Sequence, residues 1–144
     1  MNETLVKFGY PDSVIKSYSH WSVLLRPQQV TLGSLILANH SDSHTFGQLN
    51  NTDMIELSNI TKDIESVLNR CFKYDKINYL MLMMVDPHVH FHVIPRYADT
   101  REFRSLCADD VDWPGPPNLG HKLDMTQEQA QQLQRYLIEH WDCN

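Results

Sequence analysis

Residues 88–94 read HVHFHVI, and this stretch decides how the rest of the chain is interpreted. Histidine and apolar residues alternate with a period of two, which is the period of a β-strand, where successive side chains point to opposite faces. One face of the predicted strand is apolar and suited to a core. The other face carries three imidazoles, those of His88, His90 and His92.

Three histidines on one strand face call for a chemical explanation, because an ordinary solvent-facing strand surface is built from Lys, Thr, Glu and Ser. Neutral imidazoles can bind a transition metal together with ligands from elsewhere in the chain. They can also act on phosphate, one as a nucleophile and the others as hydrogen-bond donors to its oxygens. A polar strand face without chemistry is the third interpretation.

Apolar and β-branched segments before the triad predict further strands. Residues 14–26 are rich in such side chains and predict one or two strands that end near Pro27. Residues 32–38 (LGSLILA) predict another strand. Residues 77–85 (INYLMLMMV) are apolar almost throughout, which is typical of a strand buried on both faces.

Two segments predict helices. Asp53 and Glu56 have the spacing of a capping box, and apolar residues recur every three or four positions from there to Cys71. Thr126 is a candidate N-cap for a second helix over residues 125–141. Between them, residues 99–120 contain the sequence WPGPP and predict a long irregular segment, the proline-rich arm. This order of elements predicts an α+β fold with a mainly antiparallel sheet.

Composition narrows the class of protein. The 144 residues fit one domain, with 42% hydrophobic and 21% charged residues and a net charge of −6. The sequence lacks the stripe of basic residues that binding to a nucleic-acid polymer needs, so we expect no such partner. No apolar stretch is long enough for a membrane span. The N-terminus lacks a signal-peptide core, and the three cysteines show no CxxC spacing. We therefore expect a cytoplasmic protein.

Residues 88–94 resemble the histidine triad family, whose pattern is His-φ-His-φ-His-φ-φ with φ apolar. Pro95 and Arg96 are similar to the continuation seen in the fragile-histidine-triad branch. The resemblance covers residues 14–97, so we expect a single domain over residues 1–144 with a triad core at 14–97 and an arm and C-terminal helix at 98–144. It implies a histidine-triad-like fold with one long helix and a C-terminal helix.

The resemblance also implies an activity. Family members bind nucleotides and cleave at the α-phosphorus of nucleoside phosphoramidates, dinucleoside polyphosphates or related adenylates. His90 would attack phosphorus and form a covalent nucleotidyl-histidine, while His88 and His92 donate hydrogen bonds to non-bridging oxygens. Arg96 would add positive charge. A neutral imidazole is a nucleophile near its ordinary pKa of about 6.5, so no metal or other cofactor is expected.

The sequence departs from the family pattern in two places. Many members have a histidine after the glycine that opens the second strand, whereas here Gly33 is followed by Ser34, which becomes a candidate substrate contact. The segment before the triad, residues 83–87, is short and apolar where relatives have a polar, Gly-rich loop. His40 and His44 are candidate substitutes for the missing phosphate donors. Candidates for the base pocket are Trp21, Leu25 and Ile36.

The arm and the oligomeric state complete the expectations. Trp113 and Pro114 resemble a Trp-Pro segment that reaches towards the partner subunit's active site in some family members, which makes Trp113 a candidate substrate-binding residue; a proline-stiffened surface loop is the alternative. The resemblance implies a homodimer in which two sheets join edge to edge. A non-catalytic nucleotide-binding module and a histidine-ligated metalloprotein stay open as alternative functions.

Overall fold

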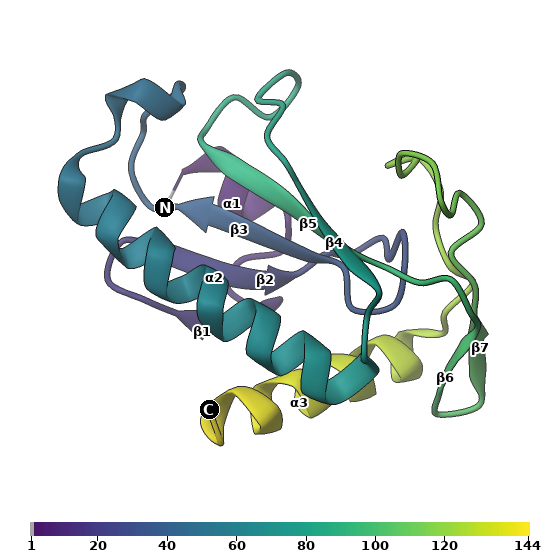
Figure 1. Cartoon of the computed structure of the whole chain (residues 1–144). Helices are drawn as coiled ribbons and strands as arrows, with labels where there is room; N and C mark the ends of the chain where they lie inside the picture. Colours follow the sequence, from purple (N-terminus) through teal and green to yellow (C-terminus); the bar gives the residue numbers. More distant parts are fainter. Residues whose placement is uncertain (1) are drawn as a thin grey trace.

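The computed structural model describes residues 2–144 and has one five-stranded antiparallel sheet flanked by three α-helices (Figure 1). The strand order is β1-β2-β3-β5-β4, and a separate two-stranded hairpin is formed by β6 and β7. The elements are α1 (Glu3–Lys7), β1 (Val14–Ser17), β2 (Trp21–Leu25), β3 (Leu35–Asn39), α2 (Asn51–Phe72), β4 (Lys76–Leu80), β5 (His90–Arg96), β6 (Arg101–Phe103), β7 (Leu106–Ala108) and α3 (Gln127–Asp142). The predicted α+β class is confirmed.

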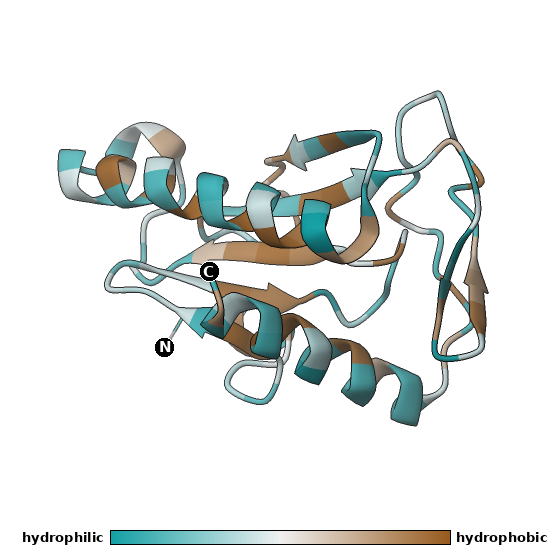
Figure 2. Ribbon diagram, turned by 60° about the horizontal axis from the view of Figure 1, so that its bottom comes forward, coloured by the Kyte–Doolittle hydropathy of each residue, from teal (hydrophilic) through white to brown (hydrophobic). Residues whose placement is uncertain are grey.

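The two long helices cover one face of the sheet, and the short α1 covers the other (Figure 1). The larger core cluster includes Val23, Leu35 and Val93 from the strands, packed with Leu68 of α2 and Leu137 of α3. Figure 2 shows the hydrophobic colour on the central strands and alternating bands along α2 and α3, as expected for helices buried on one side.

Strand register places the triad on the face that α1 covers. His92 pairs with Ile36 and His90 pairs with Ala38, so these four side chains share one face of the sheet. Ile36 and Ala38 belong to the smaller core cluster, in which Leu5 and Phe8 pack against the sheet. The short N-terminal helix, which the sequence did not predict, therefore lies next to the histidines.

The strand predicted over residues 77–85 is wrong in its length and its burial. β4 ends at Leu80 and is an edge strand, paired only with β5 and nowhere fully buried. Residues 81–89 leave the sheet, and Met84 and Val85 are 80% and 84% exposed. Met83 adopts a φ of 46°, a left-handed conformation that a strand does not accommodate. We call residues 81–89 the β4–β5 loop.

The arm is less irregular than predicted, because it contains the hairpin of β6 and β7. Arg104 and Ser105 form its two-residue turn with φ values of 45° and 68°, and positive φ at both central positions is the geometry that suits a tight hairpin. Phe103 anchors the hairpin on the helices, with its ring centroid 6.2 Å from that of Phe72 and 5.3 Å from that of Tyr136.

The helix starts are confirmed for α3 and displaced for α2. Thr126 accepts a hydrogen bond from the Gln129 amide and forms a capping box with it. In α2, the capping box joins Asn50 and Asp53, three residues before the predicted pair. Glu56 instead accepts hydrogen bonds from the backbone of His20 and Trp21, which ties α2 to the start of β2. None of the helices in residues 2–144 has the length and apolar character that crossing a membrane requires.

Candidate active site

His90 is the first residue of β5, and its ring orientation is set by the residue two positions earlier. Its Nδ1 lies 2.7 Å from the carbonyl oxygen of His88. A carbonyl only accepts, so Nδ1 carries the hydrogen and Nε2 keeps its lone pair. Burial lowers the pKa of His90, which keeps the ring neutral at pH 7. This is the tautomer and charge that a nucleophilic imidazole needs.

His92 faces a different partner. Its Nδ1 lies 3.3 Å from Nε of Arg26, and its ring centroid is 5.1 Å from that of His90. The pKa of His92 is lowered to about 4, first by burial and then by the Arg26 and His90 charges. His92 is therefore neutral at pH 7, with one ring nitrogen engaged by Arg26.

His88 lies just before β5 and is held by α1. Its Nδ1 is 2.9 Å from the hydroxyl oxygen of Thr4, which also accepts a hydrogen bond from the His88 amide at 3.3 Å. On its other side, the ring of His44 stands edge-on at a centroid distance of 4.9 Å. The predicted alternation therefore holds for His90 and His92, whereas His88 is fixed by contacts outside the strand.

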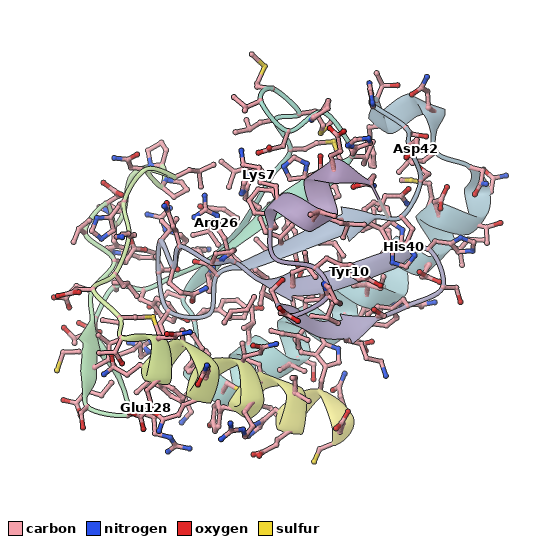
Figure 3. The ribbon with its side chains drawn as sticks, turned by 180° about the vertical axis from the view of Figure 1, so that it is seen from behind. Lys7, Tyr10, Arg26, His40, Asp42 and Glu128 are labelled. Carbon is pink, nitrogen blue, oxygen red and sulfur yellow. The ribbon has the colours of Figure 1, made fainter. Side chains whose placement is uncertain are left out.

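Two adjoining cavities open onto the triad. One, of about 350 Å³, lies between α1 and the turn after β2 and is lined by Lys7, Phe8, Arg26, Pro27, Gln28, Asp86 and His92. The other, of about 210 Å³, lies under the β4–β5 loop and reaches both His90 and His92. Arg26, Asp86 and His92 line both cavities. Figure 3 shows Lys7 and Arg26 on the side of the molecule where α1 lies.

An ion pair joins the two elements that border the cavities. Lys7 at the end of α1 lies 2.7 Å from Asp86 in the β4–β5 loop, with side-chain exposures of 52% and 18%. Arg26, by contrast, is only 7% exposed and has no carboxylate within 4 Å among residues 2–144. Burying a cation without an anionic partner is unfavourable, so the cavity is suited to an anionic ligand.

Arg96 and Trp113 lie at a different cavity, which runs along β4 and shares no residue with the other two. The Arg96 guanidinium is buried in a bidentate pair with Asp110 at 2.7 and 3.2 Å, and it also donates to Asn78 and to the Gly115 carbonyl. These bonds hold the arm against the sheet. The structure does not bring either predicted residue to the histidines of its own chain.

Ser34 and two of the predicted base-pocket residues also lie away from the triad. Ser34 is fully buried and is hydrogen-bonded to Thr31 and Gln29 within the turn before β3. Trp21 and Leu25 point to the opposite face and belong to the main core. Ile36 is on the triad face, where it is completely buried under α1.

The two loop histidines have separate surroundings. His44 contacts His88, so one of the predicted substitutes for a phosphate donor does lie beside the triad. His40 Nε2 lies 2.7 Å from the hydroxyl of Ser22, and burial lowers its pKa. Ser22 is completely buried and His40 is partly exposed, and neither residue lines a cavity that opens onto the triad.

Sequence reasoning missed Arg26, Thr4 and Lys7. The sequence does contain an indication of Arg26. In an extended strand, residues 24 and 26 face the same side, so Arg26 places a charge beside the apolar Leu24. Thr4 and Lys7 have no such indication, since α1 has only five residues, too few for a repeating hydrophobic period. Within residues 2–144, no three His, Cys, Asp or Glu side chains are grouped closely enough to hold a metal ion.

The chain is similar in structure to several histidine triad proteins. No protein-family model matches it, and a search of curated proteins finds no sequence match. A histidine triad protein of Marinobacter aquaeolei superimposes with a TM-score of 0.76 at 21% identity, over 99% of this chain and 96% of that one. One from Sinorhizobium meliloti gives 0.75 at 22% identity, over 97% and 95% of the chains.

A third similar structure is the diadenosine triphosphate hydrolase of Plasmodium falciparum, with a TM-score of 0.61 at 9% identity, over 95% of this chain and 76% of that one. At such identities the superpositions show a common architecture. Together with the strand order and the position of the three histidines, they lead to one conclusion: this chain has the fold of the histidine triad (HIT) proteins.

Proposed function

We propose that the protein is a nucleotide-binding enzyme that cleaves at an α-phosphorus through a covalent intermediate on His90. The observation that carries the proposal is the hydrogen bond from His90 Nδ1 to the His88 carbonyl, which directs the lone pair to Nε2. The ring lines a cavity beside His92 and Arg26, so a bound phosphate would meet a nucleophile and hydrogen-bond donors together.

In the first step, Nε2 of His90 forms a bond to phosphorus while the bond to the leaving group breaks. The leaving group departs with the electron pair and takes a proton from solvent, while the Nδ1 hydrogen stays on His90 beside the His88 carbonyl. His92 stabilises the negative charge on the non-bridging oxygens. Water then attacks phosphorus, the N–P bond breaks and the proton of the water returns to solvent.

The substrate is a nucleotide with a leaving group on its α-phosphate: a nucleoside phosphoramidate, a dinucleoside polyphosphate or a related adenylate. The similarity to the Plasmodium falciparum hydrolase supports the second class. The buried cation of Arg26, which no carboxylate within residues 2–144 neutralises, supports an anionic ligand in the same cavity. Either hydrolysis or transfer fits this chemistry, depending on whether water or another acceptor attacks the intermediate.

A non-catalytic nucleotide-binding module is the second candidate, and one observation favours it. At the cavity beside His90, the β4–β5 loop presents four apolar side chains, those of Leu82, Met83, Met84 and Val85. Its one polar side chain there is that of Asp86, a carboxylate already paired with Lys7, so the loop offers no ready proton donor to a leaving group. A binding module would retain the nucleotide without forming a bond to His90.

Intact-protein mass spectrometry separates the two candidates. We expect a brief reaction with an adenosine phosphoramidate or a dinucleoside polyphosphate to add one nucleotidyl group, because the intermediate is covalent. His90→Ala should remain folded, form no adduct and lose turnover. A His121→Ala control, altered outside the triad, should behave as the wild type. Turnover by His90→Ala close to the wild-type rate would exclude His90 as the nucleophile.

A further inference from the structure

Arg26 follows the last residue of β2 and is held in one orientation by three hydrogen bonds. Its Nε donates to Nδ1 of His92 at 3.3 Å, its Nη1 to the Gln28 carbonyl at 2.6 Å and its Nη2 to the Leu119 carbonyl in the arm at 3.3 Å. Arg26 is also buried, with only 7% of its surface exposed. The guanidinium therefore holds a fixed orientation, with its Nε–H directed at the His92 ring.

The donor character of Arg26 determines where the His92 hydrogen lies. A guanidinium has five N–H groups and no acceptor, and it stays protonated in proteins. Nδ1 of His92 must therefore act as the acceptor and carry no hydrogen. In neutral His92 the single ring hydrogen is then on Nε2, because the other tautomer would point two N–H groups at each other.

We propose that Arg26 is a positioning residue that fixes His92 as the Nε2–H tautomer, so that a hydrogen-bond donor faces the cavity beside His90. The tautomer follows from the contact itself, whereas its use in stabilising a substrate oxygen rests on the function proposed above. The contact between Arg26 and His92 joins two strands that are not neighbours, because β3 lies between β2 and β5. It therefore depends on the strand order and cannot be read from the position of Arg26 in the sequence.

The charges around His92 come from four elements. Arg26 follows β2, His90 is on β5, Lys7 ends α1, and Asp86 lies in the β4–β5 loop. Lys7 and Asp86 pair with each other at 2.7 Å, whereas Arg26 has no carboxylate within 4 Å among residues 2–144. Protonating His92 would bring two cations into contact, so Arg26 opposes the doubly protonated ring as well as the Nδ1–H tautomer.

Nitrogen NMR of the wild-type protein tests the proposal without any substrate. Ring ¹⁵N shifts at pH 7 should show Nε2 of His92 protonated and Nδ1 unprotonated. Observing Nδ1–H on His92 would overturn the proposal directly, and this measurement does not depend on a variant that folds.

Two variants separate the charge of Arg26 from its hydrogen bond. In Arg26→Met, the pKa of His92 should rise towards 6.5 and the ring should become a mixture of tautomers. Arg26→Lys keeps the charge but lacks the Nε–H, so the pKa should rise less while the tautomer is again mixed. Arg101→Met removes an arginine that donates to the Phe72 and Lys73 carbonyls, and it should leave His92 unchanged. An unchanged His92 spectrum in Arg26→Met would overturn the proposal.

Kinetics then distinguish this inference from the proposed function. Arg26→Met should lower kcat on the best substrate by about tenfold or more, because a fixed donor is lost from the site. Its KM should also rise, because the buried cation that favours an anionic ligand is lost. Arg26→Lys keeps the charge, so it should restore KM while recovering little of the loss in kcat. If the wild type shows the Nε2–H tautomer but forms no nucleotidyl adduct, the positioning role stands and the catalytic proposal fails. A kcat unchanged in Arg26→Met in an active enzyme would refute the catalytic use of the tautomer.

Discussion

At the scale of single residues, the triad histidines are distinguished by their partners. A backbone carbonyl holds Nδ1 of His90, a guanidinium faces Nδ1 of His92, and a threonine hydroxyl lies beside Nδ1 of His88. A carbonyl requires a hydrogen on the nitrogen it contacts, and a guanidinium requires a lone pair there. The same residue type therefore exposes a lone pair on Nε2 in His90 and an N–H group on Nε2 in His92, which are the states that the proposed nucleophile and the proposed hydrogen-bond donor require.

The lowered pKa of His92 makes the stability of the fold depend on pH. Its pKa is about 4 in the folded chain and about 6.5 in the unfolded chain, so between these values the unfolded state binds more protons. The stabilisation is fully present above pH 6.5 and is lost as pH falls towards 4. From this residue alone, the free energy of unfolding should fall by about 3 kcal/mol across that range.

Urea titrations at pH 7 and pH 4.5 measure this dependence. His92→Asn should show a smaller loss of stability on acidification than the wild type, because its amide does not titrate. His121→Asn serves as the control and should retain the wild-type loss, since His92 is still present. An equal loss in His92→Asn and the wild type would show that the His92 pKa is not lowered.

At the scale of elements, the arm is attached to the sheet by one buried ion pair. Arg96 and Asp110 have side-chain exposures of 4% and 2%, and Asp110 also accepts from the Tyr97 amide. The pair fixes the middle of the arm, just after the β6–β7 hairpin. Further along, the Gly115 carbonyl accepts from Arg96 and the Leu119 carbonyl accepts from Arg26. The arm is thereby hydrogen-bonded to Arg96, which lines the cavity along β4, and to Arg26, which lines the two cavities at the triad.

Asp110→Asn should therefore destabilise the protein by about 3 kcal/mol or more, because Arg96 would be left as an uncompensated buried charge. Chemical denaturation at pH 7 measures the change. Asp124→Asn, which alters an exposed carboxylate in the same part of the chain, should change the stability by less than about 0.5 kcal/mol. A similar effect for both variants would mean that the ion pair does not anchor the arm.

At the scale of the whole molecule, the sheet has a free edge at β4, which pairs only with β5. An edge strand presents unpaired backbone groups that another chain can pair with. We propose that two chains join at this edge to form a homodimer, in which each arm is placed near the partner's sheet. Trp113 lines the cavity beside β4, so its side chain would lie close to such an interface.

Light scattering over a concentration series checks the dimer. We expect twice the mass of one chain at micromolar concentration, because pairing two edges satisfies the free backbone groups of both. A monomer at that concentration would remove the dimer and any contribution of Trp113 to a partner's site.

The parts of this structure that the sequence predicts are those with a regular period. The alternation of histidine and apolar residues predicts β5 and its two faces, and the spacing of apolar residues predicts α2 and α3. Both predictions succeed because each pattern is local to one element. The end of β4 could not be predicted, because an apolar run does not show whether a strand is central or at the edge of a sheet. The contact of Arg26 with His92 could not be predicted for a related reason, because it depends on the pairing of β2, β3 and β5.

The apolar β4–β5 loop has a chemical consequence for the mouth of the triad cavity. Met83 and Met84 line the cavity that reaches His90, and Met84 is 80% exposed. Peroxide converts exposed thioethers to sulfoxides, and reductases can reverse this change. Each sulfoxide adds a polar, chiral group to the stretch of wall formed by residues 82–85, which is otherwise hydrocarbon and sulfur. An oxidised preparation would therefore present a different entrance to His90 and His92.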